Sequence, residues 1–211
     1  METTRQVLGA LPKGALYFLV SGIDDFDDDV VSHRSPFAAQ PKGFARIGLR
    51  VRAQVLASGV RFASLHLGTV YGPGKAFAAT VFPRLAKGRL PIVGNGANQL
   101  PLIHVDDAAR AIVHLATLPP ERLIAHPWIL TDGSGTTQRE LLELGARLLG
   151  APRPRTVPRW LASVIAGSVA AASFSRDLPT DPSALVASGF TFQYTSIATG
   201  LPATIARLGT P

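Results

Sequence analysis

Short apolar runs alternate with stretches of helical periodicity along this chain, and the alternation predicts an α/β fold. The apolar runs, rich in β-branched and aromatic residues, predict strands at 15–20, at 60–67, on both sides of a Gly-Asn-Gly turn within 90–105, and at 127–133. The helical segments are 3–11, 44–58, 76–87, 106–118, 136–150 and 199–208. Because a helix joins the first two strands through short connections, these strands are expected to pair in parallel.

Segment 44–58 shows which face of a helix the pattern assigns to the core. Phe44, Ile47, Val51 and Val55 recur at helical spacing, opposite a set of arginines, and predict the buried face. Segment 136–150 marks its own start, because Thr137 and Glu140 have the spacing of a capping box.

Segment 106–118 carries both a structural and a catalytic hypothesis. Asp106 is predicted to cap the first free N–H groups. The predicted apolar stripe is Ala109, Ile112, Val113 and Ala116. His104, just before the helix, could act as a catalytic base oriented by Asp106. Adjacent residues of this kind at a strand end more often have a structural role, so both readings stay open.

Composition narrows the function classes. The 211 residues are 46% hydrophobic and include no cysteine, which excludes disulfides and thiolate metal sites and suits a cytoplasmic location. The net charge of +7 comes from dispersed arginines rather than a run of like charges, so nucleic-acid binding is not expected. The apolar segment 160–174 is shorter than the roughly 20 residues of a spanning helix, so we expect a buried or interfacial helix and no membrane span.

The glycine-rich stretch LHLGTVYGPGKAF at 65–77 suggests a phosphate-binding loop, but it lacks the spacing of one. Gly68 is one residue too far from Gly74-Lys75 for a P-loop, and Ala76 stands where the Mg²⁺-binding hydroxyl belongs. No G-x-G-x-x-G turn follows a predicted strand. The sequence therefore offers no conventional binding loop for pyrophosphate.

Metal binding is not expected from the sequence either. The loop after the first strand contains five aspartates without EF-hand spacing, so we expect it to be solvated; they are Asp24, Asp25, Asp27, Asp28 and Asp29. The histidines form no pair with metal-binding spacing on one helix.

Three segments, in order, match the motifs of one enzyme family. HLGTVYGPG at 66–74 is similar to R-P-x-x-V-Y-G-P-G, and LPLIHVDDAARAIVHLA at 100–116 is similar to F-I-H-V-D-D-x-A-x-A. Residues 185–208 are similar to the closing segment LGF-x-P-x-x-S-L-x-x-G-L-x-x-T. The chain thus resembles the extended short-chain dehydrogenases/reductases, which are the NAD(P)-dependent epimerase/dehydratase family.

The resemblance implies NAD or NADP as cofactor and the C-terminal portion of a Rossmann-like parallel sheet, with a small mixed α/β substrate-binding part. Residues 1–74 are then the remnant of the Rossmann-like domain. Residues 75–211 are mainly the substrate-binding part, with 102–133 returning to the sheet. The family's first strands, glycine-rich turn and acidic ribose-binding residue have no counterpart here. We therefore expect a truncated chain that does not hold the cofactor tightly by itself.

The same resemblance locates the family's catalytic trio of Ser or Thr, Tyr and Lys at Gly22, Phe44 and Gly48. Phenylalanine cannot transfer a proton and glycine supplies no charge, so we expect no intact catalytic residue. The nicotinamide end of a cofactor is implied beside the loop of Leu67, Gly68, Thr69 and Val70.

Three functions remain open. One is an oxidoreductase or epimerase known from an incomplete sequence. The second is a degenerate, non-catalytic binding or assembly subunit with a protein partner or a second copy of itself. The third, a basic RNA-binding relative, is less favoured. Leu100, where sugar-nucleotide enzymes of the family carry an arginine, favours an apolar small-molecule substrate.

Overall fold

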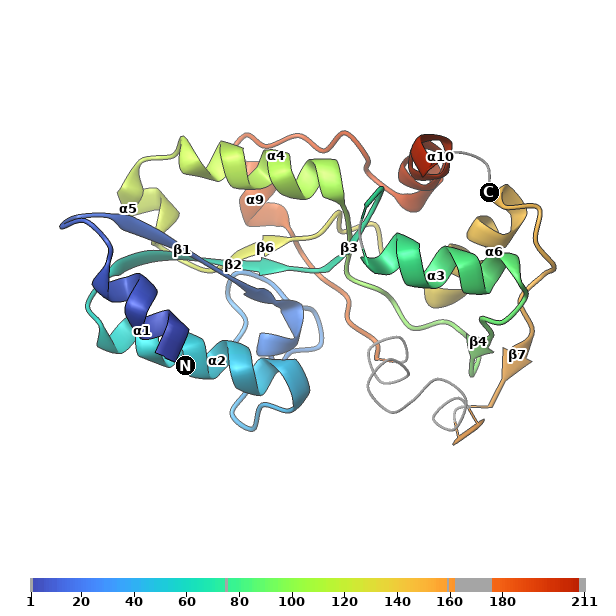
Figure 1. Cartoon of the computed structure of the whole chain (residues 1–211), viewed down its shortest axis with the longest axis horizontal. Helices are drawn as coiled ribbons and strands as arrows, with labels where there is room; N and C mark the ends of the chain where they lie inside the picture. The colour runs from blue at the N-terminus through green and yellow to red at the C-terminus, as the bar shows by residue number, and fades with distance from the viewer. Residues whose placement is uncertain (1, 75, 159, 162–175, 209–211) are drawn as a thin grey trace.

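The computed structural model describes residues 2–74, 76–158, 160–161 and 176–208, and its centre is a three-stranded parallel sheet (Figure 1). β2 (Arg61–Leu67) lies between β1 (Leu16–Gly22) and β6 (Trp128–Leu130). β1 and β2 pair from Leu16 opposite Arg61 to Gly22 opposite Leu67, so both strands end at the same edge. The predicted parallel pair is confirmed.

Helices cover both faces of this sheet, as the sequence alternation predicts (Figure 1). On one face lie α1 (Glu2–Gly9) and α2 (Gly43–Ala57). On the other lie α4 (Val105–Ala116), α5 (Pro120–Leu123) and α9 (Ser183–Ala187). The short helix η1 (Ile23–Asp25) follows directly after β1.

A smaller α/β part lies beyond the carboxyl ends of the central strands (Figure 1). It contains two short parallel pairs, β3 (Thr69–Tyr71) with β5 (Leu102–His104) and β4 (Ile92–Val93) with β7 (Thr156–Val157). Its helices are α3 (Ala76–Ala86), α6 (Gln138–Leu148) and α10 (Ile197–Leu208). The Gly-Asn-Gly turn does not produce a hairpin, because β4 and β5 each pair with another strand.

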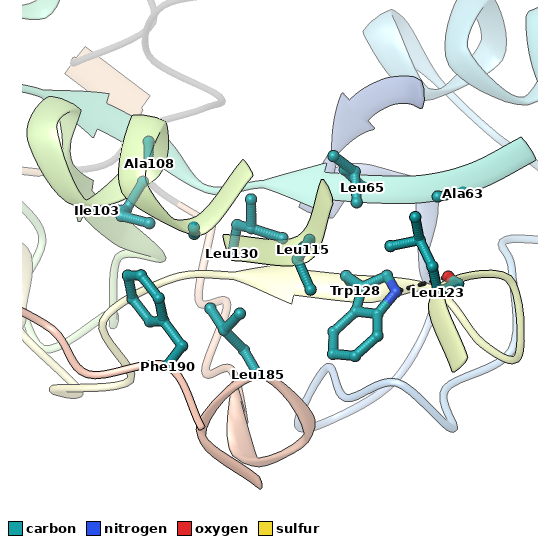
Figure 2. Packing of buried hydrophobic residues seen from close by; sticks show 11 residues of the cluster. Ala63, Leu65, Ile103, Ala108, Leu115, Leu123, Trp128, Leu130, Leu185 and Phe190 are labelled. Atoms are coloured by element: carbon teal, nitrogen blue, oxygen red, sulfur yellow. Dashed lines mark hydrogen bonds between the residues drawn. The ribbon is translucent and has the colours of Figure 1, made fainter. Parts of the chain in front are cut away.

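The main core is formed between the central sheet and the helices α4, α5 and α9 (Figure 2). Trp128 is nearly buried in it, and its Nε1 donates a hydrogen bond of 2.8 Å to the carbonyl of Leu123. The indole thus links β6 to α5, and its one polar group has a hydrogen-bond partner.

Helix α4 buries a different face from the predicted one. Its buried apolar residues are Ala108, Ala111 and Leu115, whereas Val113 of the predicted stripe is 67% exposed. The buried face is rotated by about one residue, or ~100°, from the prediction. Alanine and valine occur on several sides of this helix, so periodicity alone could not orient it.

Helix α2 also departs from its predicted orientation at its first turns. Val55 is buried as expected, but Phe44 is 69% and Ile47 62% exposed. The first turns instead bury Ala45 and bring Gly48 against η1 and the end of β1. These two small residues allow a close approach that turns the larger apolar side chains outward.

Two further expectations concern the second half of the chain. The capping box at Thr137 and Glu140 is confirmed, with the Thr137 hydroxyl accepting from the Glu140 N–H at 3.2 Å. The apolar segment predicted at 160–174 lies almost entirely outside the described residues. Among the helices described, none is both long enough and apolar enough to cross a membrane.

Candidate functional site

The carboxyl ends of β1 and β2, together with η1 and the start of α2, form the candidate functional site. Open parallel sheets bind their ligands at this edge. The structure brings two of the three sequence-predicted catalytic positions close together there, Gly22 at the end of β1 and Gly48 on the facing side of α2. Phe44 lies one turn before Gly48 and projects its ring into solvent.

Gly48 has no room for a side chain. A Cβ atom built on it would lie 2.7 Å from Oδ1 of Asp25 and would contact Oγ of Ser21 as well. Distances this short are repulsive, so any larger residue here must displace both polar groups. The glycine therefore allows α2 to pack closely against a carboxylate at the end of β1.

That carboxylate belongs to a buried polar chain. Asp25 is 2% exposed, and its Oδ2 lies 3.2 Å from Nδ1 of His66, which is fully buried. The same Nδ1 lies 3.3 Å from the carbonyl of Gly22, and Nε2 lies 2.7 Å from Oγ of Ser64. Because Nδ1 faces only acceptors, it carries a hydrogen, and Nε2 can then accept from the serine hydroxyl.

Aromatic and cationic groups enclose this chain. The rings of Phe26 and Phe37 lie 4.6 and 5.6 Å from that of His66. The guanidinium of Arg52 lies 4.0 Å above the Phe37 ring. Burial lowers the pKa of Arg52, whereas the charge of Asp25 acts to raise it. These groups form an apolar environment around the buried contact between Asp25 and His66.

The order Ser64, His66 and Asp25 has the connectivity of a nucleophile, a base and an orienting acid. All three residues are buried, with Ser64 only 8% exposed. A nucleophilic serine needs access for a substrate. The chain of contacts therefore fixes the tautomer of His66 and the position of Asp25, and it does not form a hydrolytic site.

The sequence does not indicate this cluster, for an identifiable reason. The five aspartates are expected to lie together in one solvated loop, but Asp25 is buried while Asp27, Asp28 and Asp29 are exposed. The available signal was Ser64 and His66 at alternate positions of an otherwise apolar strand. Such residues share one face of a strand, and buried polar groups require partners.

The loop implied to face a nicotinamide connects β2 to β3. The Gly68 N–H donates to the Leu130 carbonyl at 3.1 Å, and a Cβ on Gly68 would lie 2.8 Å from Cγ2 of Thr131. Thr69 is exposed, whereas Leu67 and Val70 are partly buried against the main core. Close packing between strands accounts for the glycine at 68, and its role toward a cofactor stays a prediction.

His104 has the structural role rather than the catalytic one in this structure. Its Nδ1 accepts the N–H of Asp106 at 3.2 Å, so His104, not Asp106, is the N-cap of α4. It is fully buried and lies between Tyr71 and Tyr194, with ring centroids 5.2 and 4.0 Å away. Burial lowers the pKa of His104, which keeps the ring neutral and its Nδ1 free to accept.

The other acidic residue at the start of α4 anchors the C-terminal segment. The fully buried Asp107 accepts the N–H groups of Gln193 and Tyr194, each at 2.8 Å, and pairs with Arg110 at 2.7 Å. These contacts hold the loop before α10 against α4. The described residues contain no group of three or more histidine, aspartate or glutamate side chains placed to hold a metal ion.

The part of the chain that forms the candidate site also matches a known protein family. Residues 20–125, about half of the chain, match the NAD dependent epimerase/dehydratase family. The chain belongs to this family. A 3-diazoavenalumate denitrifying reductase from a Streptomyces species is 38% identical over 106 residues, which are 49% of this chain and 33% of the reductase. The chain thus matches only about a third of that relative's length.

Solved structures share the fold over nearly the whole chain. The human epimerase family protein SDR39U1 with NADPH has a TM-score of 0.77 and 18% identity, covering 96% of this chain and 70% of that one. A conserved protein of unknown function from Silicibacter pomeroyi has a TM-score of 0.78 and 19% identity, covering 98% and 71%. DesIV, the dTDP-glucose 4,6-dehydratase of Streptomyces venezuelae, has a TM-score of 0.68 and 21% identity, covering 98% and 63%.

The family makes NAD(P) a natural cofactor to test against the residues present. A phenyl ring and a glycine backed by the Asp25 carboxylate stand where the family resemblance implies a tyrosine and a lysine. Neither can donate a proton or a positive charge to a ribose or a substrate oxygen. The resemblance therefore implies that the residues at this end of the site do not fit the nicotinamide ribose in the family's manner.

Proposed function

We propose that this chain is a catalytically degenerate member of the epimerase/dehydratase family that acts through binding. The observation that carries the proposal is the contact of Gly48 with Asp25, whose Oδ1 would lie 2.7 Å from a Cβ at position 48. The space of the family's lysine side chain is taken by a buried group of opposite charge. A change at Gly48 alone would therefore not restore that chemistry.

The proposal extends to the cofactor. The chain carries no glycine-rich pyrophosphate turn, and such a turn at a helix N-terminus supplies the N–H groups that hold dinucleotides. We propose that residues 1–211 by themselves do not bind NAD(P) tightly.

The proposed division of labour follows the two parts of the molecule. Residues 1–74 act as the remnant of the Rossmann-like domain, and 75–211 form mainly the substrate-binding part, with 102–133 returning to the sheet. We propose that the substrate-binding part takes an apolar small-molecule ligand. Leu100, which is apolar, is buried there in a hydrophobic cluster with Leu102 of β5. The absence of cysteine supports a cytoplasmic location.

Calorimetry and activity measurements together test whether the chain is catalytically degenerate. Titration of residues 1–211 with NADH and with NADPH should show no saturable binding below about millimolar concentration. The double variant F44Y/G48K should lose stability and gain no turnover, whereas F44Y alone should fold normally, because Phe44 is exposed. Tight binding of either dinucleotide, or turnover by the wild-type chain, contradicts the proposal.

An assembly role is favoured by the uncovered surface near the same site. Phe44 and Ile47 lie exposed on α2, Val20 is half exposed on β1, and β1 pairs with β2 alone among the described strands. An open strand edge with apolar neighbours is a docking surface. Sedimentation should therefore detect self-association or a bound partner, and F44S/I47S should reduce it. A monodisperse monomer at high concentration counts against this role.

A further inference from the structure

Two histidines from distant parts of the chain face each other outside the candidate functional site. His33 lies in the loop between η1 and α2, and His126 lies just before β6. Their ring centroids are 5.0 Å apart and their planes are inclined by 55°. Both residues are partly exposed, although Nδ1 of His33 itself is buried.

The hydrogen bonds of His126 leave one nitrogen free to bind a metal. Its Nδ1 lies 2.9 Å from the carbonyl of Pro127, which can only accept, so Nδ1 carries the hydrogen. The lone pair of the neutral ring is then on Nε2. A backbone carbonyl that accepts the second N–H of the imidazole is the usual support of a metal-binding histidine. Trp128, whose ring centroid is 4.4 Å away, further restrains the orientation of the His126 ring.

His33 offers the second ligand. Its Nδ1 is buried and has no hydrogen-bond partner among the described residues. Imidazole binds metals in its neutral form, which predominates above the ordinary histidine pKa of about 6.5.

The spacing of the two rings matches a shared ion. Two imidazoles bound to one tetrahedral Zn²⁺ through bonds of about 2.0 Å have ring centroids about 5 Å apart. Imidazole nitrogen is a ligand that Zn²⁺ and its neighbours in the transition series prefer. The geometry points to a binding site for a divalent transition-metal ion, formed by His33 and His126, with solvent in the remaining positions.

Such an ion would join the η1–α2 loop to the start of β6. The loop is already tied to the C-terminal segment, because Val31 bridges to Thr180 and its N–H donates to the Pro179 carbonyl at 2.9 Å. The same loop begins at Asp25 of the candidate site. Metal binding would therefore stabilise the segment that positions Asp25 against His66, independently of any activity.

Calorimetric titration of the untagged, chelator-treated chain with ZnCl₂ at pH 7.5 tests the site. One Zn²⁺ should bind per chain, Co²⁺ should give the absorption bands of a site with nitrogen ligands, and Zn²⁺ should raise the melting temperature. H33N and H126N should each weaken binding by about 100-fold or more. H114N is the matched control and should bind as the wild type does, because His114 lies on α4 and contacts Ser188.

Three results overturn the inference. These are the absence of saturable Zn²⁺ binding, unchanged affinity in either H33N or H126N, and equal loss of affinity in H114N. Circular dichroism of each variant establishes that it is folded. If H126N unfolds because the contact with Trp128 is lost, H33N decides alone, since His33 lies in a loop.

Discussion

The ring of Tyr71 leaves no room for a side chain at Gly200. A Cβ on Gly200 would contact the Tyr71 hydroxyl and would lie 2.8 Å from Cζ and 2.9 Å from Cε2 of the ring. Tyr71 ends β3 and is fully buried, and Gly200 is in the first turn of α10. Two of the motifs that resemble the family, far apart in sequence, therefore pack directly against each other.

Gly200→Ala should destabilise the fold by about 2 kcal/mol or more, because overpacking forces α10 away from β3. Tyr71→Phe by itself should be neutral or slightly stabilising, since the buried Tyr71 hydroxyl has no hydrogen-bond partner in the described part of the chain. Urea unfolding of both single variants and of the double variant measures this. The ring carbons remain in the double variant, so it should recover only part of the loss. Full stability of Gly200→Ala would contradict the packing argument.

Asp25→Ala should cost roughly 2 kcal/mol of unfolding free energy, because it leaves the buried Nδ1–H of His66 with only the carbonyl of Gly22, which is 3.3 Å away. Ser64→Ala should cost less, about 1 kcal/mol, by removing the donor to Nε2 of His66. The exposed Asp27→Ala is the matched control and should change stability by less than about 0.5 kcal/mol. Equal effects of Asp25→Ala and Asp27→Ala in chemical unfolding would argue against a buried pair.

His104→Asn should remove an acid-dependent loss of stability. The folded-state pKa of His104 lies below its ordinary value of 6.5, so its stabilising contribution is present above pH 6.5 and is lost as the pH falls below it. Protonation also places a hydrogen on Nδ1, which then cannot accept from the Asp106 N–H. Asparagine caps helices without titrating. Urea unfolding at pH 7.5 and at pH 5 measures this. The free energy of unfolding of the variant, relative to that of the wild type, should be higher at pH 5 than at pH 7.5.

Asp132→Asn should show the opposite pH dependence. Burial raises the pKa of Asp132 to about 6 from 3.8, so the folded state disfavours its charged form. Wild-type stability should fall as the pH rises from about 4 to 7, by up to roughly 3 kcal/mol from this group. The variant keeps an oxygen to accept the Ser134 N–H, which Oδ1 accepts at 2.9 Å. The variant should be as stable as the wild type at pH 4 and more stable at pH 8. A difference in unfolding free energy that does not change with pH would contradict the raised pKa of Asp132.

Most elements of the fold could be predicted, because they depend on local patterns. The βαβ unit was recognisable from two apolar runs and a helix between them, and the capping box at Thr137 needed only a spacing of three residues. The motifs at 66–74 and 100–116 indicated the family that the comparison then showed. The buried faces of the helices were harder to predict, because α4 has small apolar residues on several sides.

The candidate site was only half predictable. The sequence pointed to Gly22, Phe44 and Gly48, and the structure brings Gly48 against Asp25. It did not indicate Asp25 or His66, because one lies among exposed aspartates and the other in a buried strand. Their partnership depends on the close approach of η1 to β2, which no local pattern encodes.

The sequence by itself determined the parallel α/β architecture, the family and the absence of a proton-donating tyrosine and of a lysine on α2. Only the tertiary structure decided which polar groups meet. It packed the carboxylate of Asp25 against Gly48, and it brought the rings of His33 and His126, which are far apart in sequence, to a centroid distance of 5.0 Å. The reason is physical: hydrophobic periodicity is a short-range signal, whereas the pairing of buried polar groups is fixed by how strands and loops distant in sequence pack together.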